Sequence, residues 1–105
     1  MSAPDPDAPA RRDLEETERL ADRVAAAVSR VRGVARLMPG PVATYLPGRT
    51  VPGVAVRDGA VLVSVAARYG ESLPDVAERV RVASRRAAPG LRVDVLIDDV
   101  DVEGG

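Results

Sequence analysis

The chain contains no cysteine and no histidine. The absence of cysteine excludes disulfide bonds and thiolate nucleophiles, and the two absences together remove the usual ligands of transition metals. Without histidine, the commonest general base at neutral pH is missing as well. Most familiar hydrolase sites are therefore excluded, and the sequence directs attention to binding rather than to catalysis.

Phenylalanine, tryptophan, lysine, asparagine and glutamine are also absent, and isoleucine occurs once. Most of these residues have AT-rich codons, so a GC-rich genome accounts for the bias. All 15 basic residues are therefore arginine, which is weak support for phosphate binding. The 16 acidic residues bring the net charge to −1, so there is no basic surplus of the kind that nucleic-acid binding requires.

With 105 residues, the chain is long enough for one small domain. Valine and alanine supply most of the apolar residues, and because valine favours strands and alanine favours helices, we expect a mixed α/β core. No apolar run approaches the ~20 residues that a membrane span needs. The N-terminus has no apolar segment typical of a secretory signal, which predicts a cytoplasmic protein.

Residues 1–12 are rich in proline, aspartate and alanine, and we interpret them as a disordered tail. Asp13 is predicted to cap the first helix, since Glu16 completes a capping-box pattern three residues later. Apolar residues then recur with helical spacing as far as Gly33. A single domain is predicted over residues 13–102, followed by a disordered C-terminus at 103–105.

The clearest hairpin surrounds Asp58-Gly59, a type I′ turn signal between two valine-rich runs. A two-residue turn pairs Val54 with Val63 and Val56 with Val61. All four valines then share one sheet face, so the turn and the hydrophobic alternation predict the same register.

A second helix is predicted from Ser72, with Pro74 in its first turn and Asp75 completing another capping box. Residues 91–98 alternate like a strand. The Pro/Gly-rich residues 39–53 are expected to form either a binding site or an irregular connector, and within them Val42 to Leu46 could extend into a strand. The predicted fold is a two-layer α+β sandwich of order α-β-β-β-α-β. Two helices pack on one face of a three- to four-stranded mixed sheet.

The stretch Tyr69-Gly70-Glu71-Ser72-Leu73-Pro74-Asp75-Val76-Ala77 resembles the alkaline shock protein family, also called the Gls-type envelope stress response family. The segments Val31-Arg32-Gly33-Val34, "VPGVAVRDGAVLVSV" and "RVDVLIDDV" are similar to that family too, so the resemblance covers about residues 14 to 102. The chain departs from many members in having only two aromatic residues and no lysine, and in stopping close to the last strand.

The resemblance implies a non-enzymatic stress response protein that acts as a small cytosolic scaffold without a cofactor or a small-molecule substrate. It further implies recruitment to the inner face of the cell membrane by a small membrane-anchored partner, or contact with homologous domains, including a homo-oligomer. The rival function is nucleic-acid binding through a KH-like or ferredoxin-like sheet. A KH domain needs a GXXG loop between helices, and none is present there, so this alternative is disfavoured.

Tyr69 and Gly70 have two interpretations. Tyr69 could be part of a partner surface, since tyrosine is enriched at interface hot spots. Alternatively, Gly70 permits a positive φ at a strand-to-helix corner and Tyr69 covers the sheet edge, which we favour. Tyr45 and Arg49 form an exposed pair in the 39–53 segment and are a second candidate for partner contact.

Four arginines of the second helix, at positions 79, 81, 85 and 86, could meet nucleic acid or anionic lipid. The preferred interpretation is a salt-bridged helix whose cations complement its C-terminal dipole. The segment "DDVDVEGG" begins like an EF-hand loop but ends too early, and we interpret it as a solvated acidic tail.

The sheet face turned away from the helices is the last candidate. Leu62 and Leu96 are its largest apolar members, and Arg68 lies on the same face by strand parity. A solvated antiparallel face more often carries polar residues at such positions. The sequence therefore predicts an interaction surface comprising Tyr45, Arg49, Leu62, Arg68, Tyr69 and Leu96, with no catalytic, cofactor-binding or metal residues.

Overall fold

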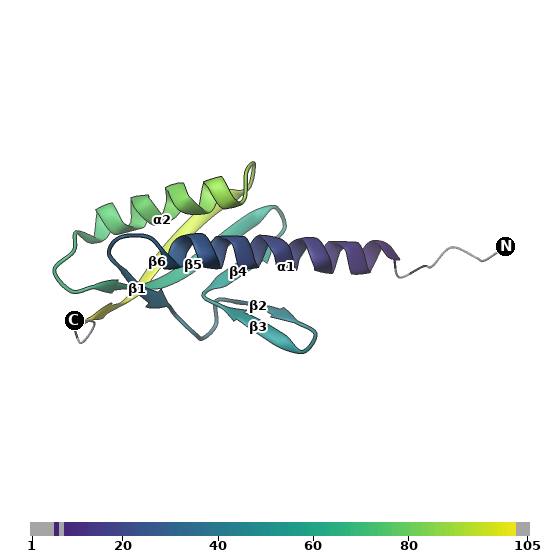
Figure 1. Ribbon diagram of the computed structural model, residues 1–105, viewed down its shortest axis with the longest axis horizontal. Helices are drawn as coiled ribbons and strands as arrows, with labels where there is room; N and C mark the ends of the chain where they lie inside the picture. Colours follow the sequence, from purple (N-terminus) through teal and green to yellow (C-terminus); the bar gives the residue numbers. More distant parts are fainter. Residues whose placement is uncertain (1–5, 7, 103–105) are drawn as a thin grey trace.

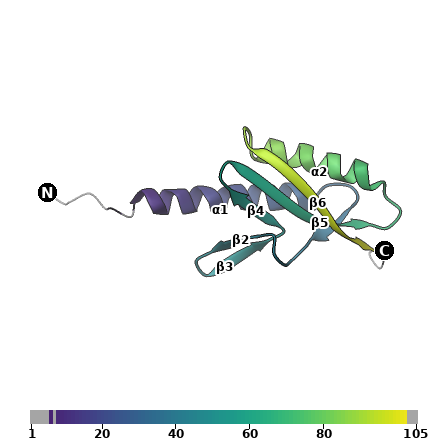
Figure 2. The same cartoon turned by 180° about the vertical axis from the view of Figure 1, so that it is seen from behind.

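A computed structural model describes residue 6 and residues 8–102. These residues form two helices and six strands. In order they are α1 (Ala8–Ser29), β1 (Val34–Leu37), β2 (Ala43–Leu46), β3 (Arg49–Pro52), β4 (Val54–Arg57), β5 (Ala60–Arg68), α2 (Leu73–Ala87) and β6 (Arg92–Asp101). Both helices lie on one side of the main sheet, in front of it in Figure 1 and behind it in Figure 2. The predicted two-layer α+β fold is confirmed.

Strand β5 is the centre of the main sheet. Along one edge it pairs in parallel with β6, and the other edge is shared by β4 and β1, both antiparallel. The exchange from β4 to β1 happens at Ser64, whose N–H donates to the Gly53 carbonyl while its own carbonyl accepts from the Met38 N–H. The second edge of β5 is therefore paired with β4 along its first half and with β1 along its second half. The chain between β1 and β4 leaves the main sheet.

The β4–β5 hairpin has the predicted register. Val54 pairs with Val63 and Val56 with Val61. The turn places Asp58 at φ 49° and Gly59 at φ 75°, as a type I′ turn requires at both central positions. Glycine adopts this conformation without a steric penalty, and aspartate is among the residues that tolerate it best.

Residues 43–52 form a second, two-stranded hairpin. The strand considered for Val42 to Leu46 is present as β2, whereas the irregular connector expected for the rest of the segment is wrong where β3 forms. Strands β2 and β3 pair antiparallel around Pro47-Gly48, with Gly48 at φ 82°. Proline followed by a positive-φ glycine is typical of a type II turn, which is rare in two-residue hairpins because its twist splays the strands. Buried Thr44 links this hairpin to the main sheet by donating its hydroxyl to the Val54 carbonyl of β4 at 2.7 Å.

The first helix begins at Ala8, five residues before the predicted cap Asp13, which lies inside it. Alanine and arginine are strong helix formers, and Pro9 sits in the first turn, where proline costs least. Residues 8–12 are thus helical and not a disordered tail. Residues 1–5, residue 7 and the C-terminal 103–105 lie outside the described residues.

The second helix begins as predicted. Ser72 is its N-cap and accepts a hydrogen bond from the Asp75 N–H at 3.4 Å, and Pro74 lies in the first turn. Val76 and Val80 lie on the inner face of this helix and are fully buried. Ser84 continues the same stripe and is also fully buried, which the sequence analysis missed.

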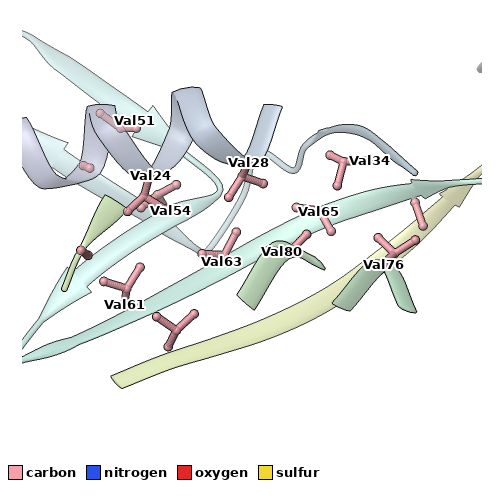
Figure 3. Close-up of a cluster of buried hydrophobic side chains, with 14 residues drawn as sticks. Val24, Val28, Val34, Val51, Val54, Val61, Val63, Val65, Val76 and Val80 are labelled. Carbon is pink, nitrogen blue, oxygen red and sulfur yellow. The ribbon is translucent and has the colours of Figure 1, made fainter. Parts of the chain in front are cut away.

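Valine dominates the core between the two layers (Figure 3). The fully buried valines come from α1, β4, β5 and α2, and they are Val24, Val28, Val54, Val61, Val63, Val65, Val76 and Val80. Because these side chains are short, the layers must approach closely to exclude water. The hydrophobic face of the sheet is therefore fully used by the helices, and its other face remains uncovered by any helix.

Candidate interaction surface

The open face of the main sheet exposes two leucines. Leu62 on β5 is 37% exposed and Leu96 on β6 is 44% exposed, whereas their neighbours Val61 and Val63 point to the core and are fully buried. In the parallel β5–β6 ladder, Leu96 is opposite Ser64, so the two leucines are diagonal neighbours on one face. The predicted orientation of both residues is confirmed.

An open hollow of about 490 Å³ lies beside Leu62. Its walls come from the loop before β2, from the β4–β5 hairpin and from the start of β6. The lining residues are Pro41, Val42, Ala55, Arg57, Asp58, Gly59, Ala60, Val61, Leu62, Arg92 and Asp94. Arg92 and Asp94 form an ion pair of 3.1 Å at its rim. The leucine end of the face therefore combines apolar surface, small residues and one charge of each sign.

The other end of the open face is closed by side chains. Arg36 on β1 lies 2.9 Å from Asp101 and 3.7 Å from Asp99, both on β6. Ala66 of β5, which is in register with Arg36 on one side and Asp99 on the other, is fully buried. Asp99 and Asp101 therefore belong to the last strand, and the solvated acidic tail predicted there is wrong for both residues.

Arg49 is engaged within the chain. Its Nη2 donates to Glu18 Oε1 and to Asp22 Oδ2, each at 2.7 Å, and its Nη1 donates to Asp22 Oδ1 at 3.2 Å. The hydrogen bonds to Asp22 and Glu18 raise the pKa of Arg49 above its usual value. Its role is to fasten the β2–β3 hairpin to α1. Tyr45 is 65% exposed on the same hairpin, in a sheet separate from Leu62 and Leu96.

Tyr69 and Arg68 lie at the far end of β5. Gly70 has φ 90°, as expected for the strand-to-helix corner, but Tyr69 is 74% exposed and does not cover the sheet edge. At a rise of about 3.3 Å per residue, Tyr69 is about 23 Å along the strand from Leu62. The six predicted surface residues therefore do not form one patch: Leu62 and Leu96 are neighbours at one end of β5, and Arg68 and Tyr69 lie together at the other.

The ion pairs of Arg36 were missed by sequence reasoning. These ion pairs require β1 and β6 to lie on opposite edges of β5, with a bulge in each pairing that aligns the side chains. No short-range sequence pattern predicts such an arrangement. In the described part of the chain, no three acidic side chains gather in a way that could hold a metal ion. None of the described helices combines the length and apolarity needed to cross a membrane.

Comparison with known proteins gives one structural likeness. No family model matches the chain, and no curated protein matches it. The fold is similar to that of MamM-CTD, in a variant with an aspartate and a histidine replaced by alanine. The TM-score is 0.58 at 14% sequence identity, and the match covers 84% of this chain and 99% of that one. At this identity the likeness shows a shared fold.

Proposed function

We propose that this protein is a non-enzymatic interaction module that pairs the leucine end of its open sheet face with the same face of a second copy. The observation that carries the proposal is the exposure of Leu62 and Leu96 as diagonal neighbours on a face that no helix covers. Large apolar side chains held together on a rigid sheet are typical of an association surface.

The charges beside the leucines favour a second copy as the partner. Arg92 and Asp94 lie on the same face, next to Leu62. A two-fold dimer joins identical patches, so Arg92 of one copy can meet Asp94 of the other. The small, partly exposed Ala55 beside Leu62 lets the two sheets approach closely. Because the apolar patch is small, the dimer is expected to be weak and dependent on concentration.

The cellular role proposed for this module is that of a cytosolic scaffold in envelope stress, held near the membrane by a small anchored partner. It is supported by the resemblance of residues 69–77 and of the β4–β5 hairpin to the alkaline shock family. The absence of cysteine and histidine from the sequence supports a non-catalytic role. Turnover of a general hydrolase or phosphatase substrate, abolished by a point mutation, would contradict it.

Sedimentation equilibrium tests the association. The double variant Leu62→Glu and Leu96→Glu should remain folded, because both side chains are outside the core, and should sediment as a monomer where the parent dimerises. The matched control is Leu14→Glu and Val82→Glu on the two helices, whose exposures of 44% and 37% equal those of Leu96 and Leu62. The control should dimerise like the parent. A dimer lost only in the control would move the interface to the helices.

A further inference from the structure

A second candidate surface lies on the helix layer, away from the open sheet face. Helices α1 and α2 run side by side there (Figure 1), and a groove of about 710 Å³ lies between them. Its lining consists almost entirely of arginine and alanine, namely Arg23, Ala26, Ala27, Arg30, Ala83, Arg86, Ala87 and Pro89.

Helical spacing explains this composition. On α1, residues 23, 26, 27 and 30 follow the i, i+3, i+4, i+7 pattern that places side chains on one face. On α2, residues 83, 86 and 87 follow the same pattern. The alanines leave the groove shallow and apolar, so that the backbone of a bound segment can approach closely. The arginines contribute their long side chains to its rims, where the charged ends remain exposed.

The three groove arginines differ from five arginines elsewhere in the structure. Arg36, Arg49, Arg79, Arg81 and Arg92 each have a carboxylate oxygen within 3.7 Å. Arg23, Arg30 and Arg86 have no such partner among residues 8–102. Within the same residues, the ion pairs expected for the arginines of α2 are therefore present at Arg79 and Arg81 but not at Arg85 or Arg86. The net charge of −1 conceals a local excess of positive charge in this groove.

We propose that the groove binds an acidic peptide segment of a partner protein. Its carboxylates would pair with Arg23, Arg30 and Arg86, and its small apolar side chains would rest on the alanines. This inference does not depend on the proposed dimer, because the groove and the open sheet face are on opposite layers. One copy can therefore use both surfaces at once.

The groove is less suited to other polyanions. Single-stranded nucleic acid is held by aromatic stacking in addition to charge, and the chain's two aromatic residues, Tyr45 and Tyr69, lie outside the groove lining. A lipid surface is bound through large apolar side chains that insert among the acyl chains, and the groove offers alanine. A carboxylate-bearing segment with small side chains fits both the charge and the depth.

Fluorescence anisotropy with a labelled peptide of alternating glutamate and alanine tests the assignment. The groove variant carries Arg23→Gln, Arg30→Gln and Arg86→Gln. The matched control carries Arg12→Gln, Arg57→Gln and Arg85→Gln, which removes the same charge and also neutralises one arginine in the last turn of α2. We expect the groove variant to bind about tenfold more weakly and the control to stay within about twofold of the parent.

Three further measurements decide the result. Circular dichroism melts should show that both variants fold, and a glutamine-for-glutamate peptide should not bind. Equal weakening in both variants, or no binding of the acidic peptide at low salt, would overturn the proposal. Tighter binding of a single-stranded oligonucleotide or of anionic vesicles, lost in the groove variant, would also overturn it and reassign the groove. None of these outcomes depends on the sedimentation result for the open face.

Discussion

Arg36 on β1 donates to Asp101 on β6 at 2.9 Å, across the central strand β5 to which both strands pair. Two bulges make this possible, one between Val34 and Arg36 and one in β6 where its register with Val65 and Ala66 shifts. The ion pair joins the two edges of the sheet and closes one end of its open face. Only the end that carries the two leucines is left for a partner.

Removing this ion pair should have a modest effect on stability. The Arg36 side chain is 48% exposed, so Arg36→Ala is expected to lower the free energy of unfolding by about 0.5–1 kcal/mol. Urea denaturation at low and high salt measures it, and the difference from the parent should shrink at high salt. The control is Arg57→Ala, which should be neutral. A loss that is independent of salt would assign the effect to lost packing over Ala66 instead.

The strand register can be tested with two adjacent positions. Val63→Asp places a charge in the core without a partner and should cost at least about 4 kcal/mol, which unfolds a domain of this size. Leu62→Asp puts the same charge on the open face and should leave the fold intact. Thermal melts of the two variants compare them directly. Equal stability of the pair would contradict the register.

Ser84 offers a stabilising substitution. Its hydroxyl is fully buried, and within the described residues no hydrogen-bond partner reaches it. Ser84→Ala removes this polar atom and improves helix propensity, so the free energy of unfolding should rise by about 1 kcal/mol. Ser29→Ala is the control, because the Ser29 hydroxyl donates to the Ala25 carbonyl at 2.7 Å, and it should not stabilise. Chemical denaturation measures the stability of both variants. A Ser84→Ala variant less stable than the parent would indicate a role for the hydroxyl.

The anchoring of the β2–β3 hairpin depends on Arg49. Arg49→Gln loses its charged hydrogen bonds to Asp22 and Glu18, so amides of residues 43–52 should exchange with deuterium faster than in the parent. Amides of β5 should be unchanged, because its pairing does not involve α1. Hydrogen exchange read by mass spectrometry separates the two segments. Faster exchange throughout the chain would show that Arg49 supports the whole domain.

The sequence predicted best where local signals agreed. Asp58-Gly59 and the alternating valines gave the β4–β5 register and hence the orientation of Leu62. Ser72 and Pro74 gave the start of α2. A strand at Val42 to Leu46 was considered, but its pairing with β3 was missed because the Pro-Gly turn between them is atypical. Arg36 and Arg49 were missed as structural residues because their partners are distant in sequence. The grouping of the three groove arginines depends on how α1 and α2 pack together, which helical periodicity alone does not determine.

The central claim is that two copies meet through the open sheet face. Isotope-filtered nuclear Overhauser spectra of a mixture of labelled and unlabelled protein measure methyl contacts between copies directly and need no substitution. Our account predicts intermolecular signals from the methyl groups of Leu62 and Leu96. Intermolecular signals confined to Val82 and the groove alanines, or a protein that stays monomeric at the high concentrations used for such spectra, would contradict it.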